Sequence, residues 1–154
     1  MTRRIPGACA ALPARTLLRL ILLAALLLPW SATGKEVTGD DALTIRNVVQ
    51  SQLEAFAADD ATAAFGLATS STRALLGSPE QFLQLIKEHY PPIYRHRGAL
   101  FSQPEMIDGH VLLMVRLTAH DNVVWLAVYE MAQEEGGDWK IDGCNLFETT
   151  SVSV

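Results

Sequence analysis

The stretch VLLMVRLTAHDNVVWLAVYEM, residues 111–131, decides the fold because its side chains alternate with a period of two. Successive residues of a β-strand point to opposite faces of the sheet, so the stretch predicts strands at 111–118 and 123–131. Asp121-Asn122 between them is typical of a tight turn. Both faces of these strands are apolar, so one face must pack on helices and the other needs a second cover, such as another subunit.

Further strands are expected on both sides of this pair. Gly136-Gly137 predicts a hairpin that leads into a last strand at 138–148. A short strand is expected at 99–102, where the apolar period has already changed from near 3.6 to two. The carboxyl-terminal half is therefore predicted to be an antiparallel sheet of about four strands.

The residues before the sheet have helical spacing. Apolar residues recur every three or four positions over 41–58, which predicts a long amphipathic helix, and Asp59-Asp60 ends it before a short helix at 61–68. A Ser/Thr cluster at 69–72 predicts a turn, with a helical turn at 73–76 as an option.

A third helix has the clearest local signal. Ser78 occupies an N-cap position, Pro79 the first helical position and Gln81 the position three residues after the serine. The helix should end near His89, because the prolines of Tyr90-Pro91-Pro92 cannot donate backbone hydrogen bonds.

Residues 1–34 are predicted to be a signal peptide outside the fold. Four arginines and no acidic residue precede an apolar run at 20–30, followed by small residues. Cleavage between Gly34 and Lys35 would place Ala32 and Gly34 at the two positions where the peptidase requires small side chains. We therefore expect export to the periplasm or the extracellular space, a domain at 35–150, and a short tail at 151–154.

Two other interpretations of this segment remain open. The apolar run is shorter than the roughly 20 residues of a membrane-spanning helix, which argues against an uncleaved anchor. Thr2-Arg3-Arg4 resembles a twin-arginine signal, but it lies far from the apolar run.

Removing residues 1–34 makes the domain strongly acidic. The segment holds four of the twelve basic residues and none of the 17 acidic ones, so the net charge changes from −5 to −9. Such a domain is poorly suited to bind phosphates, so nucleic-acid binding is not expected. Cys9 is lost with the segment, which leaves Cys144 without an intramolecular disulfide partner; burial in a strand is the expected role for its thiol.

The order of these elements resembles an NTF2-like (cystatin-like) domain, in which three amino-terminal helices pack on a curled antiparallel sheet to form a cone. The sequence motifs are similar to those of an exported bacterial family described only as a domain of unknown function. The resemblance covers roughly residues 42–150 and rests on these motifs: Ile45-Arg46-x-Val48-Val49-x-x-Gln52-Leu53-x-Ala55-Phe56, Ala64-Phe65, Tyr90-Pro91-Pro92, Tyr94-Arg95, Phe101, and Gly137-Asp138-Trp139-Lys140-Ile141-Asp142-Gly143-Cys144. It implies the fold and no catalytic residue.

Candidate ligand-binding residues concentrate in the connector at 90–97 and on the third strand. Tyrosine, arginine and histidine side chains suit an anionic or aromatic ligand, although the same residues would serve in a rigid connector or in the core. The candidates are Tyr90, Tyr94, Arg95, His96, Trp125 and Tyr129.

Catalysis and metal binding have weaker support. An isomerase or lyase in such a cone would need a carboxylate or histidine in an apolar pocket. Asp142 is the only acid in the middle of a predicted strand. It is two residues from Lys140, so both side chains are expected on the same, solvated face. His110 and His120 lie about 33 Å apart on one strand, and no metal-ligand motif is present. No metal or cofactor is expected.

The sequence therefore predicts a non-catalytic exported α+β domain, dimeric through its sheet. Any ligand would be a small, largely apolar molecule in the cone, oriented by Tyr94 or Arg95. The alternatives are an isomerase or lyase that uses the same pocket and an interaction module that contacts an envelope protein through the sheet face.

Overall fold

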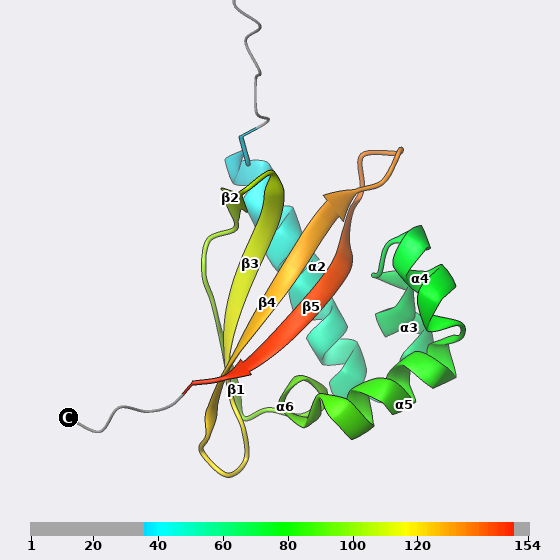
Figure 1. Ribbon diagram of the computed structural model, residues 1–154, viewed down its shortest axis with the longest axis vertical. Helices are drawn as coiled ribbons and strands as arrows, with labels where there is room; N and C mark the ends of the chain where they lie inside the picture. Colours follow the sequence, from blue (N-terminus) through cyan, green and yellow to red (C-terminus); the bar gives the residue numbers. More distant parts are fainter. Residues whose placement is uncertain (1–35, 150–154) are drawn as a thin grey trace, which may run out of the picture. The chain divides into compact units, whose positions relative to one another are not determined.

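Helices precede strands in the computed structural model, which describes residues 36–149 (Figure 1). The helices are α2 (Gly39–Ala57), α3 (Ala61–Gly66), α4 (Ser70–Leu76), α5 (Pro79–His89) and α6 (Pro91–Tyr94), and the strands are β1 (Gly98–Phe101), β2 (Glu105–Ile107), β3 (His110–Thr118), β4 (Val124–Gln133) and β5 (Trp139–Glu148). The predicted α+β class is confirmed. The predicted signal peptide, residues 1–34, and the tail, 151–154, lie outside the described residues.

Helix α2 begins at a capping box that starts it two residues before the predicted position. The Thr38 hydroxyl accepts a 3.2 Å hydrogen bond from the backbone N–H of Asp41, and the Asp41 side chain accepts from the Thr38 backbone. Each side chain thus satisfies a backbone donor that the helix leaves unpaired. Asp40 and Asp41 lie in the first turn, where a negative charge interacts favourably with the positive end of the helix dipole and stabilises the helix.

Helix α5 confirms the predicted start and end. Ser78 is the N-cap and accepts from the Gln81 backbone N–H at 3.2 Å, and Pro79 is the first helical residue. Beyond the end of α5 the structure adds a single turn, α6, that begins at Pro91. The two prolines are compatible with this turn because first-turn N–H groups have no helical partner in any case.

All strand pairs in the described sheet are antiparallel. The order is β1-β3-β4-β5, and β2 also pairs with β3. The sequence predicted about four strands; β2, the addition, is joined to β3 through Asp108 and Gly109, which both have positive φ. An Asp-Gly pair is a strong hairpin signal because it accommodates such a turn.

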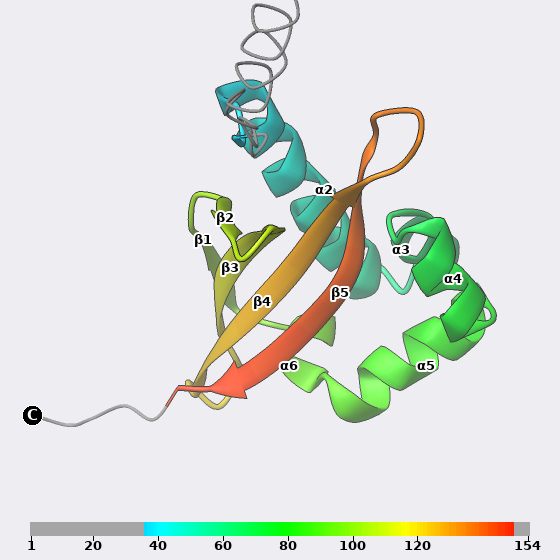
Figure 2. The same cartoon turned by 45° about the horizontal axis from the view of Figure 1, so that its top comes forward.

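The predicted alternation divides the sheet into two faces. Leu113, Tyr129 and Cys144 lie opposite one another on β3, β4 and β5, on the face that meets the helices. Helix α2 crosses this face, and α3, α4 and α5 lie beyond the β5 edge (Figure 1; Figure 2). Ile45, Phe56 and Leu113 are fully buried, so the core lies between α2 and the sheet.

A β-bulge changes the parity of strand β5. Glu130 pairs with Gly143 whereas Met131 pairs with Ile141, so Asp142 is an extra residue without a partner on β4. The prediction that Asp142 faces solvent was wrong. Its carboxylate is half-buried and accepts a 2.7 Å hydrogen bond from the Thr69 hydroxyl at the start of α4, because a bulge turns the extra residue out of the strand alternation.

Candidate binding site

An apolar cleft lies between the helices and the β4–β5 part of the sheet. Its volume is about 180 Å³. The lining residues come from α2, the segment at 68–76, α5, the connector at 90–93, and strands β4 and β5: Gln52, Phe56, Ala68, Thr72, Leu76, Phe82, Leu85, Ile86, Tyr90, Ile93, Tyr129, Ile141, Gly143 and Cys144. Leu85 is 37 % exposed and marks the solvent side of the cleft.

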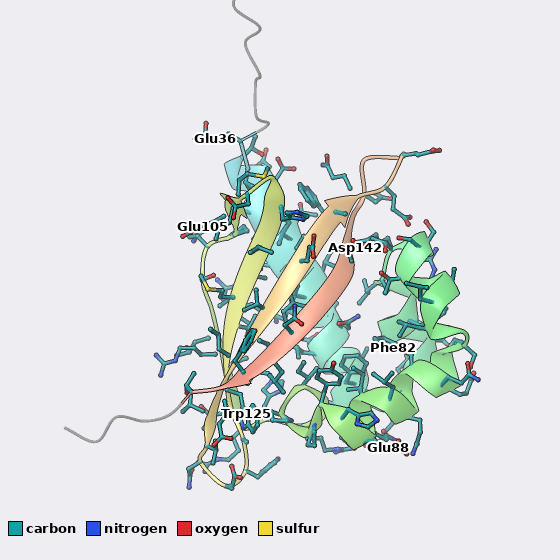
Figure 3. The ribbon with its side chains drawn as sticks, viewed as in Figure 1. Glu36, Phe82, Glu88, Glu105, Trp125 and Asp142 are labelled. Atoms are coloured by element: carbon teal, nitrogen blue, oxygen red, sulfur yellow. The ribbon has the colours of Figure 1, made fainter. Side chains whose placement is uncertain are left out.

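Aromatic rings form the helix side of this cleft. The ring of Phe82, on α5, packs edge-on against that of Phe56, with centroids 5.4 Å apart. The ring centroid of Phe65, on α3, lies 6.2 Å from that of Phe82. Figure 3 shows Phe82 on the side of α5 that faces the rest of the helices. These contacts hold α3 and α5 together and so fix one wall of the cleft.

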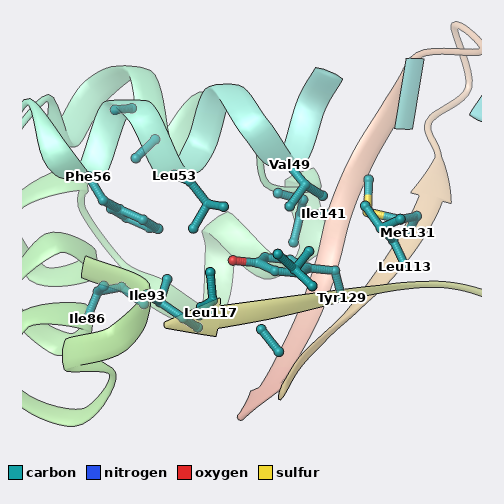
Figure 4. Close-up of a cluster of buried hydrophobic side chains, with 14 of the residues drawn as sticks. Val49, Leu53, Phe56, Ile86, Ile93, Leu113, Leu117, Tyr129, Met131 and Ile141 are labelled. Carbon is teal, nitrogen blue, oxygen red and sulfur yellow. The ribbon is translucent and has the colours of Figure 1, made fainter. Parts of the chain in front are cut away.

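Tyr129 lines the cleft and carries a buried polar atom. Its side chain is fully buried, and its phenol oxygen has no hydrogen-bond partner among the described residues. In Figure 4 the phenol points into the space between Leu53 and Leu117. Burial raises the pKa of Tyr129 well above its ordinary value, and its neighbour Cys144 raises it further. The phenol is therefore a neutral hydrogen-bond donor in an apolar setting.

Cys144 is the cross-strand neighbour of Tyr129. Burial raises the pKa of the Cys144 thiol to about 12, which the Tyr129 phenol partly offsets. A thiol is a weak hydrogen-bonding group. It lies close enough to the phenol for each group to affect the pKa of the other, but the phenol oxygen has no partner at hydrogen-bonding geometry within the described chain. A thiol with so high a pKa is not a nucleophile at neutral pH. The residue lies on β5, as expected, and is half-buried rather than fully buried.

Gln52 adds an amide to the same cleft. It is 3 % exposed on α2, and its amide nitrogen donates to the Ala64 carbonyl at 3.2 Å. This bond ties α2 to α3. Gln52 was not among the candidates predicted from the sequence, although a glutamine among the apolar positions of an amphipathic helix is a visible signal.

Two other predicted candidates, Tyr94 and Arg95, lie outside the apolar cleft. The Tyr94 phenol donates to Asp59 at 2.7 Å, and Arg95 pairs with the other carboxylate oxygen at 3.0 Å. Lys87 completes the cluster, 2.8 Å from Asp59. The hydrogen bond from Lys87 is the main reason that the pKa of Asp59 is lowered, and the one from Tyr94 adds to it.

The six candidates are thus divided among three places. Tyr90 and Tyr129 line the apolar cleft. Trp125 lines a separate hollow of about 550 Å³ together with Tyr94 and Arg95, and Figure 3 shows Trp125 well apart from Phe82. His96 belongs to a third, polar hollow, to which Arg95 also contributes.

Two further observations concern the described residues alone. Within 36–149, no group of three or more His, Cys, Asp or Glu side chains is placed to hold a metal ion. In the same residues, no helix has the length and apolar character needed to cross a membrane.

The comparisons with known proteins identify a family. No curated protein and no solved structure matches the chain. A match to a protein family covers residues 38–154, which is most of the chain and includes every described helix and strand. The family is described as a domain of unknown function. The chain therefore belongs to the family of unknown function DUF4864.

Proposed function

We propose that this protein is an exported, non-catalytic NTF2-like domain that binds a small, largely apolar molecule in the apolar cleft. The observation that carries the proposal is the Tyr129 phenol, which is buried at the cleft without a hydrogen-bond partner in the described chain. A buried polar group that lacks a partner costs stability. A ligand oxygen that reached the phenol and accepted a hydrogen bond from it would remove this cost.

The size of the cleft limits the ligand. An engineered apolar cavity of roughly 150 Å³ binds benzene, and the cleft measures about 180 Å³. We infer a ligand of about one ring or a short chain, with one oxygen that accepts a hydrogen bond. A carbonyl compound meets this description, because it is an acceptor only and the neutral phenol is a donor.

Two further features support the proposal. The long helix α2 across one face of an antiparallel sheet supports the NTF2-like interpretation. The arginine-rich, acid-free segment before the apolar run supports export.

An isomerase or lyase in the same cleft has less support. Such an enzyme needs a group that gains and loses a proton near neutral pH. In the described chain the cleft is lined by no Asp, Glu or His, and the raised pKa values of Tyr129 and Cys144 keep both groups protonated.

Native mass spectrometry of the protein, purified gently from the envelope of its own host, is the first test. We expect a retained small mass that is absent from the Ala68→Leu variant, which fills the cleft, and from Leu85→Trp, which blocks its solvent side. Leu75→Ala is the matched control, because Leu75 is 88 % exposed on α4 and does not line the cleft.

A pair of probes tests the role of the phenol. Cyclohexanone and cyclohexane have similar shape, but only the ketone accepts a hydrogen bond. Binding is measured by NMR, and Tyr129→Phe should weaken binding of the ketone relative to that of cyclohexane by about 2- to 10-fold, the value of one neutral hydrogen bond. If neither probe binds and no mass is retained, the binding function is wrong.

A second candidate function is homodimerisation through the outer sheet face. Leu100, Arg116, Leu126 and Phe147 are opposite one another across β1, β3, β4 and β5. Leu100 is 68 % and Phe147 55 % exposed, and no described helix covers this row. Analytical ultracentrifugation should give a dimer for the native chain and a monomer for Phe147→Glu, whereas a native monomer would exclude this function.

A further inference from the structure

A polar hollow of about 470 Å³ lies beside helix α2, separate from the apolar cleft. Arg46, Gln50 and Glu54 line it from α2, His96 from the connector between α6 and β1, Phe101 from β1, and His120 from the turn between β3 and β4. Four separate parts of the chain thus bring chemically active side chains together at one place.

Arg46 is the cation of this hollow that is free to bind a ligand. Its guanidinium lies over the ring of Phe101, 5.1 Å from the ring centroid. Within residues 36–149 it forms no ion pair. The other arginine of the hollow, Arg95, already pairs with Asp59 at 3.0 Å. Stacking on an aromatic ring holds the planar guanidinium in place and leaves its edge, with its N–H groups, available.

His96 supplies polarity to the hollow without a fixed charge. His96 is half-buried, and its Nδ1 atom has no hydrogen-bond partner among the described residues. Burial lowers the pKa of His96; the backbone of Pro92 partly offsets this effect, and nearby His120 lowers the pKa further. At neutral pH His96 is therefore a neutral ring beside the guanidinium.

The remaining walls favour a monoanion with an apolar body. Leu53, Ala57 and Ala99 line the hollow beside the Phe101 ring. Glu54, which accepts a 2.9 Å hydrogen bond from Gln50, adds one negative charge to the wall. A dianion such as phosphate would be repelled by the Glu54 carboxylate and by the acidic domain, and only one guanidinium is available to balance its two charges. A ligand with a single carboxylate matches the guanidinium in both charge and geometry.

We propose that this hollow binds a small organic monocarboxylate, with its carboxylate on Arg46 and its apolar body against Phe101. The site is independent of the function proposed for the apolar cleft, because the two sets of lining residues share none. Residues 35–154 contain more than twice as many acidic as basic residues, so most of the surface repels anions. Arg46, which forms no ion pair in the described chain, is a local positive charge that would attract an anion to this hollow.

Isothermal titration calorimetry of the full chain with benzoate and with its neutral counterpart benzamide tests the site. Benzoate should bind about tenfold or more tightly than benzamide, as expected for a charge-assisted hydrogen bond. Arg46→Gln should remove this preference, and Arg46→Lys should restore part of it. Arg73→Gln is the matched control, because Arg73, on α4, lines neither the hollow nor the apolar cleft and should leave binding unchanged.

Phe101→Leu keeps the wall apolar but removes the ring under the guanidinium, and should weaken benzoate binding severalfold. Ala68→Leu fills the apolar cleft and should have no effect here, so failure of one site is distinguishable from failure of the other. Four results would overturn the proposal: no saturable binding of benzoate at millimolar concentration, equal affinity for benzamide, tighter binding of inorganic phosphate, or loss of benzoate binding in Ala68→Leu.

Discussion

The phenol of Tyr94 donates a 2.7 Å hydrogen bond to Asp59, and so joins the connector after α5 to the turn after α2 across 35 residues of sequence. Asp59 has a positive φ of 55°, a conformation that aspartate tolerates better than most residues. Lys87 and Arg95 pair with the same carboxylate. Asp59 is therefore the centre of the contacts that hold these two turns together.

This arrangement predicts acid sensitivity. The hydrogen bond from Lys87, and then that from Tyr94, lowers the pKa of Asp59 below its ordinary value of 3.8. A carboxylate with a lowered folded-state pKa stabilises the fold above its ordinary pKa, and this stabilisation is lost as the pH falls through the folded-state value. Urea denaturation at pH 7 and pH 3 should show that Asp59→Asn, which suits the same backbone conformation, is less stable at pH 7 and loses less on acidification. An equal loss in both proteins would contradict the role of Asp59.

Alkaline pH should destabilise the fold through Cys144. Burial raises the pKa of its thiol from 9.0 to about 12, so the unfolded state ionises first. The stabilisation is complete below pH 9 and is lost as the pH rises toward 12. Thermal denaturation from pH 8 to pH 11 should show a steeper fall for the native protein than for Cys144→Ala. Tyr129, whose pKa is also raised, should keep some pH dependence in that variant.

Removing the hydroxyl of Tyr129 should stabilise the ligand-free protein. Because the phenol oxygen is buried without a partner in residues 36–149, Tyr129→Phe removes a desolvated polar group and leaves the ring in place. We expect the free energy of unfolding to rise by about 1 kcal/mol. Tyr90→Phe is the control, because Tyr90 is only half-buried. A clear loss of stability in Tyr129→Phe would mean that the hydroxyl has a partner.

Adjacent leucines test the two faces of β3. Leu113 is fully buried under the helices, whereas Leu112 lies on the opposite face and is half-buried. Leu113→Ala should cost about 2–5 kcal/mol, as expected for a buried leucine. Leu112→Ala should cost less than half as much in the same chemical-denaturation measurement. The reverse order would place the core on the other face of the sheet.

Local signals predicted most of the elements. Ser78-Pro79 fixed the start of α5 in advance because capping depends only on neighbouring residues, and the period of two predicted β3 and β4. The Asp108-Gly109 turn was also a local signal, but β2, with three residues, was too short to show an alternation of its own.

The parts that depend on long-range contacts were not predictable in this way. Asp142 was placed on the wrong face because a bulge is set by register against β4, which no local pattern reveals. Arg46 and Phe101 are 55 positions apart in the sequence, and they meet only because α2 crosses the face of the sheet near β1. Tyr129 was selected as an aromatic candidate, but its lack of a partner follows from the packing around it.

The short contact between Leu67–Thr69 and Ile141 has a consequence for misfolding. Strand β5 is at the end of the sheet order. The Ile141 N–H donates to the Leu67 carbonyl, and its carbonyl accepts from the Thr69 N–H, both at 2.9 Å. The segment that leads into α4 therefore occupies the backbone groups of Ile141 at an edge that would otherwise be open to another strand. Detachment of α3 and α4 would expose that edge next to apolar residues, so aggregation of this protein should begin with loss of these helices while the sheet is still intact.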